Sequence, residues 1–136
     1  MTTTSRTVIS IRTTERTAML DVTSRVQQSL QSLQAREGLC LLFCPHTTAG
    51  LTVNEGADPE VARDISDTLT RLVPAHADYR HTEGNSDAHV KSALTGVSLC
   101  VGVEAGHLVL GKWQRIFFCE FDGPRQRELW VRFAGA

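Results

Sequence analysis

Residues 79–89 concentrate side chains that can do chemistry around one glycine, with almost no apolar residue to suggest a core element. Imidazoles such as those of His81 and His89 bind metal ions or act as general bases, and neighbouring carboxylates and amides orient them. The same residue types also fill ordinary surface loops. The spacing of the two histidines therefore permits a metal or catalytic site without requiring one.

A predicted helix start follows within this segment. Ser86 is a favourable N-cap, Asp87 falls in the first turn, and a neutral or apolar run covers 88–94. Helix N-termini present unpaired N–H groups and a partial positive charge, so this place could hold an anion or a metal-bound water. We predict a loop that leads into a short helix closed by Gly96, with His89 in its first turn.

A third histidine follows a predicted buried strand. The continuous apolar run 39–44 lies between Gly38 and Pro45, which predicts a central strand covered on both faces. His46 comes directly after this strand, so a rigid element would hold its side chain, as a metal ligand or base requires. A turn residue without a chemical role fits the same position.

Length, charge and cysteine content limit the class of protein. The chain has 136 residues and a formal net charge of −1, which predicts a single domain over 1–136 with one core. The sequence has neither a basic block nor a long apolar span, which argues against nucleic-acid and membrane partners. The polar segment 1–7 lacks the apolar region of a secretion signal, so we expect a cytoplasmic protein. The cysteines lie in apolar runs and are predicted to be buried free thiols: Cys40, Cys44, Cys100 and Cys119.

The first half of the chain predicts a strand and two longer helices. Residues 7–12 alternate polar and apolar side chains, as in a half-buried strand. Apolar residues at steps of three and four from Asp21 predict a helix that Gly38 caps. Asp58, followed by proline, is an N-cap pattern, and the apolar face after it predicts a second helix that Pro74 stops.

The final third of the chain predicts an antiparallel β-meander. Its apolar runs alternate with turn residues and occupy 97–103, 108–110, 114–121 and 128–133. Helices early in the chain and strands late argue for an α+β fold with a mostly antiparallel, sandwich-like sheet, two longer helices and one short helix. A doubly wound parallel fold is not expected.

Three separated segments together resemble the YjbQ family, small proteins often labelled secondary thiamine-phosphate synthase enzymes. The segments are 45–55, beginning Pro-His-Thr-Thr-Ala; 81–89, with Gly-Asn-Ser-Asp-Ala-His; and 110–125, with Leu-Gly-Lys-Trp-Gln and Glu-Phe-Asp-Gly-Pro-Arg. The resemblance extends over nearly the whole chain in one order. Gly50 departs from the small residue, serine or alanine, that we expect in the family.

The resemblance implies an α+β fold, a homotrimer and a pocket near subunit boundaries that can hold a divalent metal. Zinc suits imidazole ligands best, and magnesium is the other possibility. Glu55 and Asp87 would orient an imidazole or act as general base, and Asn85 belongs to the same catalytic set. The implied metal ligands are the histidines of the matching motifs, His46, His81 and His89.

The last hairpin predicts the anion-binding side of the site. Arg125 and Arg127 alternate after the turn 122–124, so both point to one sheet face and could hold a phosphate or pyrophosphate. A solvated edge strand or a subunit salt bridge to Glu120 explains them equally well.

Three functions follow. The first, implied by the resemblance, is a thiamine-phosphate-synthase-like transferase that couples a pyrimidine pyrophosphate to a thiazole phosphate. The second is metal-dependent hydrolysis of a small phosphorylated or acyl substrate, and the third is a non-catalytic trimer that binds a metal or anion. In each, the partner is a small anionic molecule. Trp113 and Gln114 either line the pocket or pack in the core.

Overall fold

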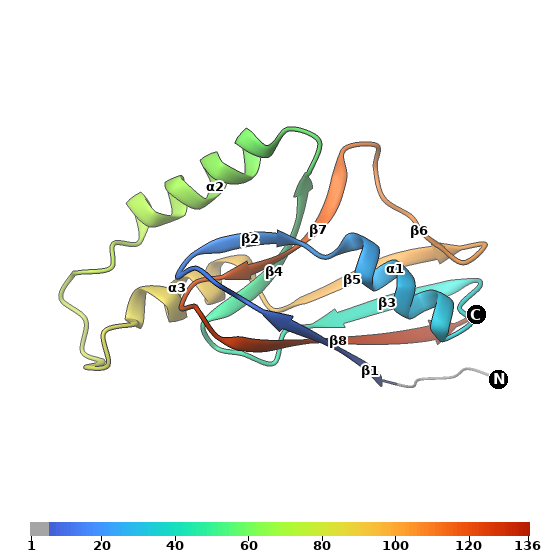
Figure 1. The fold of residues 1–136 in the computed structure, drawn as a ribbon, viewed down its shortest axis with the longest axis horizontal. Helices are drawn as coiled ribbons and strands as arrows, with labels where there is room; N and C mark the ends of the chain where they lie inside the picture. Colours follow the sequence, from blue (N-terminus) through green and yellow to red (C-terminus); the bar gives the residue numbers. More distant parts are fainter. Residues whose placement is uncertain (1–5) are drawn as a thin grey trace.

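Eight strands form two antiparallel sheets in the computed structural model, which describes residues 6–136 (Figure 1). The large sheet has the order β1-β8-β3-β5-β6 and the small sheet the order β2-β7-β4, with every neighbouring pair antiparallel. The expected α+β fold with mostly antiparallel strands is confirmed. The strands are β1 (Arg6–Arg12), β2 (Ala18–Asp21), β3 (Gly38–Phe43), β4 (Ala49–Glu55), β5 (Ser98–Glu104), β6 (His107–Leu108), β7 (Gln114–Glu120) and β8 (Gln126–Gly135).

The helices are α1 (Thr23–Ser32), α2 (Pro59–Leu72) and α3 (Ser86–Thr95). The second starts as predicted, because the Asp58 carboxylate accepts a hydrogen bond from the Glu60 backbone N–H at 2.9 Å and proline occupies the first turn. The first is shorter than expected, since Gly38 begins β3 instead of capping the helix. It therefore has ten residues, as α3 does, and only α2 is long.

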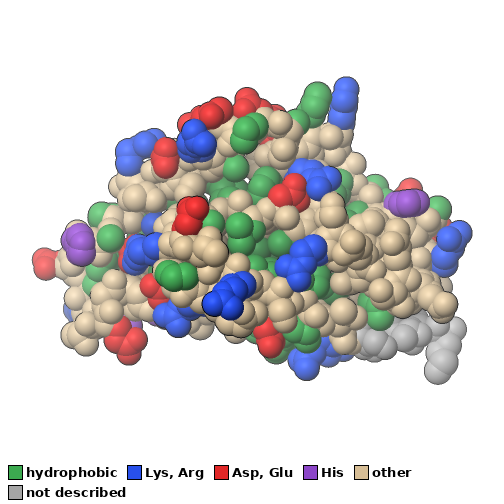
Figure 2. Space-filling model, viewed as in Figure 1, with side chains coloured by type: hydrophobic (Ala, Val, Ile, Leu, Met, Phe, Trp, Pro, Cys, Tyr) green, Lys and Arg blue, Asp and Glu red, His purple; other side chains and the backbone are tan. Residues whose placement is uncertain are grey.

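The main core lies between the two sheets and under α1. Alternate side chains of the large sheet, such as Leu42 and Leu129, meet Leu51 and Phe118 of the small sheet in one cluster. The other face of β7 packs against the helices, so that Phe117 contacts the cluster to which α2 and α3 contribute. The strand β7 is thus buried on both faces from Ile116 onward, and the apolar side chains between α2 and the strands remain visible on the face shown in Figure 2.

The central strand β3 differs from its prediction. It lies in the middle of the large sheet, as expected, but only one of its faces is covered in the single chain. Leu39, Leu41 and Phe43 are 42–48% exposed, and Val8 on β1 is exposed to a similar degree. The outer face of the large sheet is therefore apolar and uncovered. We call it the outer sheet face.

The predicted meander is wrong in its pairing. The strands β5 and β6 do pair, but β7 crosses to the small sheet and β8 returns to the large one between β1 and β3. The strands β2 and β4 were not predicted, because β2 has only four residues, β4 has few large apolar side chains, and both pair only with the distant β7. Cys100 is exposed, against expectation, while the other cysteines are buried and all of them are free thiols.

Steric crowding explains why a glycine occupies position 50. A Cβ atom at this position would lie 2.1 Å from the Thr95 hydroxyl and 2.7 Å from the Gly96 carbonyl oxygen. The Leu51 N–H also donates to this carbonyl at 3.0 Å. The glycine therefore lets β4 lie directly against the end of α3, whose start carries the candidate site.

Among the described residues, no helix is long and apolar enough to cross a membrane. Residues 1–5, which belong to the polar segment 1–7 considered as a possible secretion signal, lie outside the described residues.

Candidate functional site

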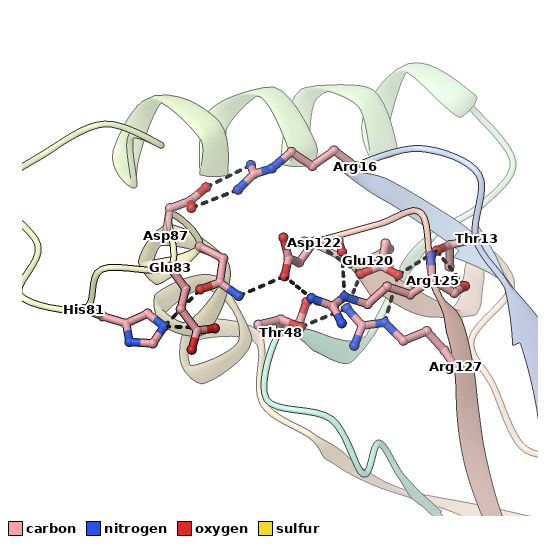
Figure 3. A network of polar contacts seen from close by, with 11 residues as sticks. Thr13, Arg16, Thr48, His81, Glu83, Asp87, Glu120, Asp122, Arg125 and Arg127 are labelled. Atoms are coloured by element: carbon pink, nitrogen blue, oxygen red, sulfur yellow. Dashed lines mark hydrogen bonds and ion pairs between the residues drawn. The ribbon is translucent and has the colours of Figure 1, made fainter.

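Asn85 connects the histidine loop to the last hairpin. It precedes α3 as its N-cap residue, so that the helix start fixes its backbone. Its side-chain Nδ2 donates to the Asp122 carboxylate at 2.9 Å, and its Oδ1 lies 3.1 Å from Nε2 of His81 (Figure 3). An amide oxygen can only accept, so Nε2 of His81 carries the proton and, in the neutral ring, Nδ1 keeps a lone pair. The ring of His89 lies edge-on to that of His81, with centroids 5.4 Å apart.

Asp122 also holds Arg125. Its carboxylate accepts a hydrogen bond from Nη2 of Arg125 at 2.8 Å, and its backbone carbonyl accepts from Nε at 2.9 Å. Partial burial opposes ionisation, but the hydrogen bonds from Asn85 and Arg125 keep the pKa of Asp122 below its ordinary value. One ionised carboxylate thus links a half-exposed guanidinium to the amide that fixes the tautomer of His81.

A second carboxylate–guanidinium pair lies beside the first but is buried. Arg127 forms an ion pair with Glu120, and its Nη2 also donates to the Thr48 hydroxyl at 2.9 Å. Thr13 donates to Oε1 of Glu120 at 2.7 Å, the oxygen that also accepts from Nε of Arg127 at 2.8 Å. Glu120 is fully buried and Arg127 is 3% exposed. The ion pair to Glu120 thus forms within one chain, and it engages Nε and Nη2 of Arg127.

His46 bridges from the end of β3 to β8. Its Nε2 accepts a hydrogen bond from the Glu128 backbone N–H at 2.8 Å, which leaves the proton of the neutral ring on Nδ1. The ring lies edge-on to Phe118, with centroids 6.5 Å apart. Burial, reinforced by the charge of Arg127, lowers the pKa of His46 from 6.5, so the ring is neutral at pH 7.

Four of the side chains described above, His46, Asn85, Arg125 and Arg127, line one cavity of about 370 Å³, which we call the polar cavity. The loop after β3, the start of α3 and the start of β8 bring its walls together. Its lining residues are Pro45, His46, Thr47, Thr48, Glu83, Asn85, His89, Arg125 and Arg127. The structure thus gathers most of the residues predicted for metal, amide and anion roles, from three distant segments of the chain.

The three predicted metal ligands are only partly assembled. His81 adjoins His89, and His89 shares the polar cavity with His46. Within residues 6–136, no group of three or more His, Cys, Asp or Glu side chains is close enough to hold a metal ion. The lone pair of His46 on Nε2 is occupied by the Glu128 N–H, so this imidazole needs a rearrangement before it can bind a metal.

Asp87 lies away from the imidazoles. Its carboxylate is fully buried and accepts two hydrogen bonds from Arg16, each at 3.1 Å (Figure 3). Lys91, itself buried, places its ammonium 3.7 Å from the same carboxylate. Burial acts against the charge, yet Arg16 holds the pKa of Asp87 below its ordinary value. This residue joins α3 to the loop before β2 through its ion pair with Arg16.

The remaining predicted residues lie at the other end of the small sheet. Glu55 pairs with Gln114 at the far end of β4, a strand that runs about 20 Å from Ala49 at 3.3 Å per residue. The Glu55 carboxylate accepts a hydrogen bond from the Asp58 N–H at 3.2 Å. Trp113 is 55% exposed, with Lys112 against its ring, and so does not pack in the core. Within one chain these side chains cannot reach the polar cavity.

Comparison with known proteins identifies the family of this chain. The model of the family described as UPF0047 protein YjbQ-like matches residues 7–136. The chain belongs to the YjbQ-like UPF0047 family. It is 47% identical to UPF0047 protein YugU of Bacillus subtilis, over 93% of this chain and 97% of that protein. It is 44% identical to a UPF0047 protein of Methanocaldococcus jannaschii, over 92% of this chain and 91% of that protein.

Solved structures of the same family share the fold. An uncharacterised YjbQ/UPF0047 protein from Clostridium acetobutylicum superposes with a TM-score of 0.91 at 44% identity, covering 93% of this chain and 98% of that one. A YjbQ-like protein of unknown function from Sulfolobus solfataricus gives a TM-score of 0.95 at 28% identity over the full length of both chains. The family fold therefore holds across widely diverged sequences.

Sequence reasoning missed Asp122 as a functional candidate in this YjbQ-like chain. The residue was interpreted only as part of a turn, because Asp-Gly-Pro is a strong turn pattern. A signal was present, since an aspartate three residues before an arginine at a turn can fold back onto the guanidinium. What no local pattern could indicate is the contact with Asn85, which lies 37 positions earlier in the chain.

Proposed function

We propose that the polar cavity is the active site of a small metal-assisted enzyme that acts on a phosphorylated small molecule. The observation that carries this proposal is the convergence of His46, His89, Asn85 and Arg125 on one cavity, with the ring of His81 against that of His89. A cavity that brings together imidazoles, an oriented amide and a half-exposed guanidinium combines groups for proton transfer with groups for anion binding.

The metal would be held first by His81 and His89. The Asp122–Asn85–His81 chain supports this assignment, because ligating histidines usually donate their second ring N–H to a partner that fixes the tautomer. The fit is incomplete at His46, which would have to release the Glu128 N–H to act as third ligand. Imidazole ligands favour zinc over magnesium. A bound zinc ion would supply a Lewis acid for a phosphoryl oxygen and lower the pKa of a bound water.

The phosphate would lie against Arg125. Its guanidinium is half exposed, and Asp122 holds it at the cavity wall, so little side-chain entropy is lost on binding. The Nδ1–H of neutral His46 provides a second donor. Arg127 would act indirectly, because its buried pair with Glu120 shapes the wall and orders Thr48.

Metal analysis tests the ligand assignment. Protein purified without a histidine tag should contain stoichiometric zinc, and His81→Ala should lose most of it. His76→Ala is the matched control, because His76 is exposed and outside the cavity-lining set. Equal metal content in wild type and His81→Ala would show that the ligand assignment is wrong.

The specific reaction suggested by the family resemblance is thiamine-phosphate-synthase-like transfer, in which a cation and Arg125 would ease the loss of pyrophosphate. Incubation with the pyrimidine pyrophosphate and the thiazole phosphate should give the coupled product, and Arg125→Ala should abolish it while the fold survives. Phosphate release from phosphorylated substrates in place of coupling would favour the hydrolase.

A non-catalytic anion-binding protein is the second candidate. The observation in its favour is the commitment of the His46 lone pair to the Glu128 N–H, which makes this imidazole a hydrogen-bond donor toward the cavity. This function predicts that phosphate binds with equal affinity before and after treatment with a chelator, and that no phosphorylated compound is turned over.

We infer a homotrimer from the family resemblance. The exposed Val8, Leu39, Leu41 and Phe43 of the outer sheet face support a subunit interface there. Light scattering after size exclusion should give three times the chain mass of 15.0 kDa. Leu41→Lys should shift the mass toward that of a monomer, because a lysine at the centre of an apolar interface is left unpaired. Gln28→Lys on the exposed side of α1 is the control. A wild-type monomer would contradict this inference.

A further inference from the structure

A second, larger cavity adjoins the polar cavity. It has a volume of about 650 Å³, and we call it the apolar cavity. The two cavities share four lining residues, Pro45, His46, Thr47 and His89. Because the imidazoles of His46 and His89 line both, the two cavities meet at the proposed reactive groups.

The walls that belong to the apolar cavity alone differ in chemistry from those of its neighbour. They include Phe43, Ala93 and Val97, whereas the polar cavity has Glu83, Asn85 and the two arginines. The polar groups of the apolar cavity are already engaged. The Ser92 hydroxyl donates to the Ala49 carbonyl at 2.6 Å, and the Cys44 N–H donates to the Val97 carbonyl at 2.7 Å. This wall therefore offers contact area to a ligand but few free hydrogen-bonding partners.

We propose that the substrate is a phosphomonoester with a compact apolar group, an aromatic ring or a branched alkyl chain. Its phosphate lies against Arg125 in the polar cavity, and its apolar group lies against Phe43, Ala93 and Val97. The bond between the two parts then passes His46 and His89, where the reacting atoms need to be. This inference rests on the proposed phosphate site and adds the class of substrate.

A polar metabolite and a second copy of the chain are the alternative occupants of the apolar cavity. A fully polar metabolite would leave the apolar cavity filled with water and gain nothing from its walls. A second copy of the chain could reach the apolar cavity, since Phe43 belongs to both this cavity and the outer sheet face. Continuity with the phosphate site favours the substrate's own apolar group.

Two phosphonates of equal charge test the proposal, because their carbon–phosphorus bonds resist hydrolysis. In calorimetric titrations the untagged full chain should bind phenylphosphonate about tenfold more tightly than methylphosphonate, as expected for the burial of part of a ring. Ala93→Phe should remove this preference, because the added ring takes the place of the phenyl group of the ligand. Ala93 is exposed on α3, so the added ring fills the cavity without disturbing the core.

The controls separate this proposal from the one on which it rests. Leu94→Phe places the same ring on the next residue of α3, outside the cavity-lining set, and should keep the wild-type preference. If wild type binds both phosphonates equally, the apolar cavity is not a substrate site although the phosphate site stands. If it binds neither, the phosphate site is wrong as well. A change of oligomeric mass in Ala93→Phe with unchanged ligand preference would assign the apolar cavity to a second copy and overturn the proposal.

Discussion

Two carboxylate–guanidinium pairs stand side by side at the start of β8, yet their surroundings give them different tasks. Glu120 and Arg127 are buried and bonded further to threonines, whereas Arg125, paired with Asp122, is half exposed (Figure 3). Both arginines line the polar cavity, but only Arg125 exposes much of its guanidinium there. The residue types are nearly the same in both pairs. Burial therefore decides which pair holds the fold together and which one is available to a ligand.

Removal of one partner of the buried pair should have the largest effect on stability. Arg127→Met leaves the Glu120 charge buried without a partner, which should cost about 3–5 kcal/mol of unfolding free energy. Urea denaturation followed by circular dichroism measures the change. The double variant Arg127→Met with Glu120→Leu should recover most of the loss, because no buried charge remains. A loss under about 1 kcal/mol in the single variant would contradict the difference between the pairs.

Removal of the half-exposed guanidinium of Arg125 should weaken ligand binding strongly and change the stability of the fold little. Arg125→Ala should weaken the binding of methylphosphonate by about tenfold to a hundredfold, the loss expected for a charge-assisted hydrogen bond. The unfolding free energy should change by less than about 1 kcal/mol, because the pair is half exposed. Arg63→Ala on α2 is the control, since this arginine pairs with Glu60 on the surface. Unchanged binding in Arg125→Ala would remove the proposed anion site.

The stabilisation by the buried Glu120–Arg127 pair should be lost as the pH falls. Burial alone would raise the pKa of Glu120, but the hydrogen bonds from Arg127, the Asp122 backbone and Thr13 hold it below the ordinary value of 4.5. The stabilisation is therefore complete above pH 4.5 and is lost as pH falls through the lower pKa of the folded state. The difference in unfolding free energy between wild type and Glu120→Gln should shrink as pH falls below 4.5. A constant difference from pH 7 to pH 2 would mean that Glu120 keeps an ordinary pKa.

The smallest effect is expected at His46. Burial and the charge of Arg127 lower the pKa of its imidazole below 6.5 in the folded chain, so the unfolded chain binds a proton first as pH falls. Wild-type stability should therefore decline slightly as pH drops below 6.5. His46→Gln should lack this component, because the amide oxygen can accept from the Glu128 N–H without titrating. Identical slopes in wild type and His46→Gln between pH 7 and pH 5 would contradict a lowered pKa.

Local patterns were most reliable where one segment decides its own conformation. The Asp58 N-cap with its proline specifies the start of α2, and alternation specifies β1, because both depend on neighbouring residues alone. Ser86 was one position from the observed N-cap, Asn85. The pairing of β7 with β2 and β4 could not be predicted, since it joins residues 59 to 102 positions apart through a core that forms only on folding.

For the candidate site, too, some features could be inferred from the sequence and others only from the tertiary structure. The sequence by itself identified the histidine motifs, Asn85 and the arginines as chemistry without an evident place in the core, and fixed the family through its three motifs. Only the tertiary structure decided that Asp87 and Arg127 serve buried ion pairs while Asn85 and Arg125 face a cavity. Residue type sets what a group can donate, accept or ionise, but distance and burial set with which partner it does so, and these depend on how distant segments pack.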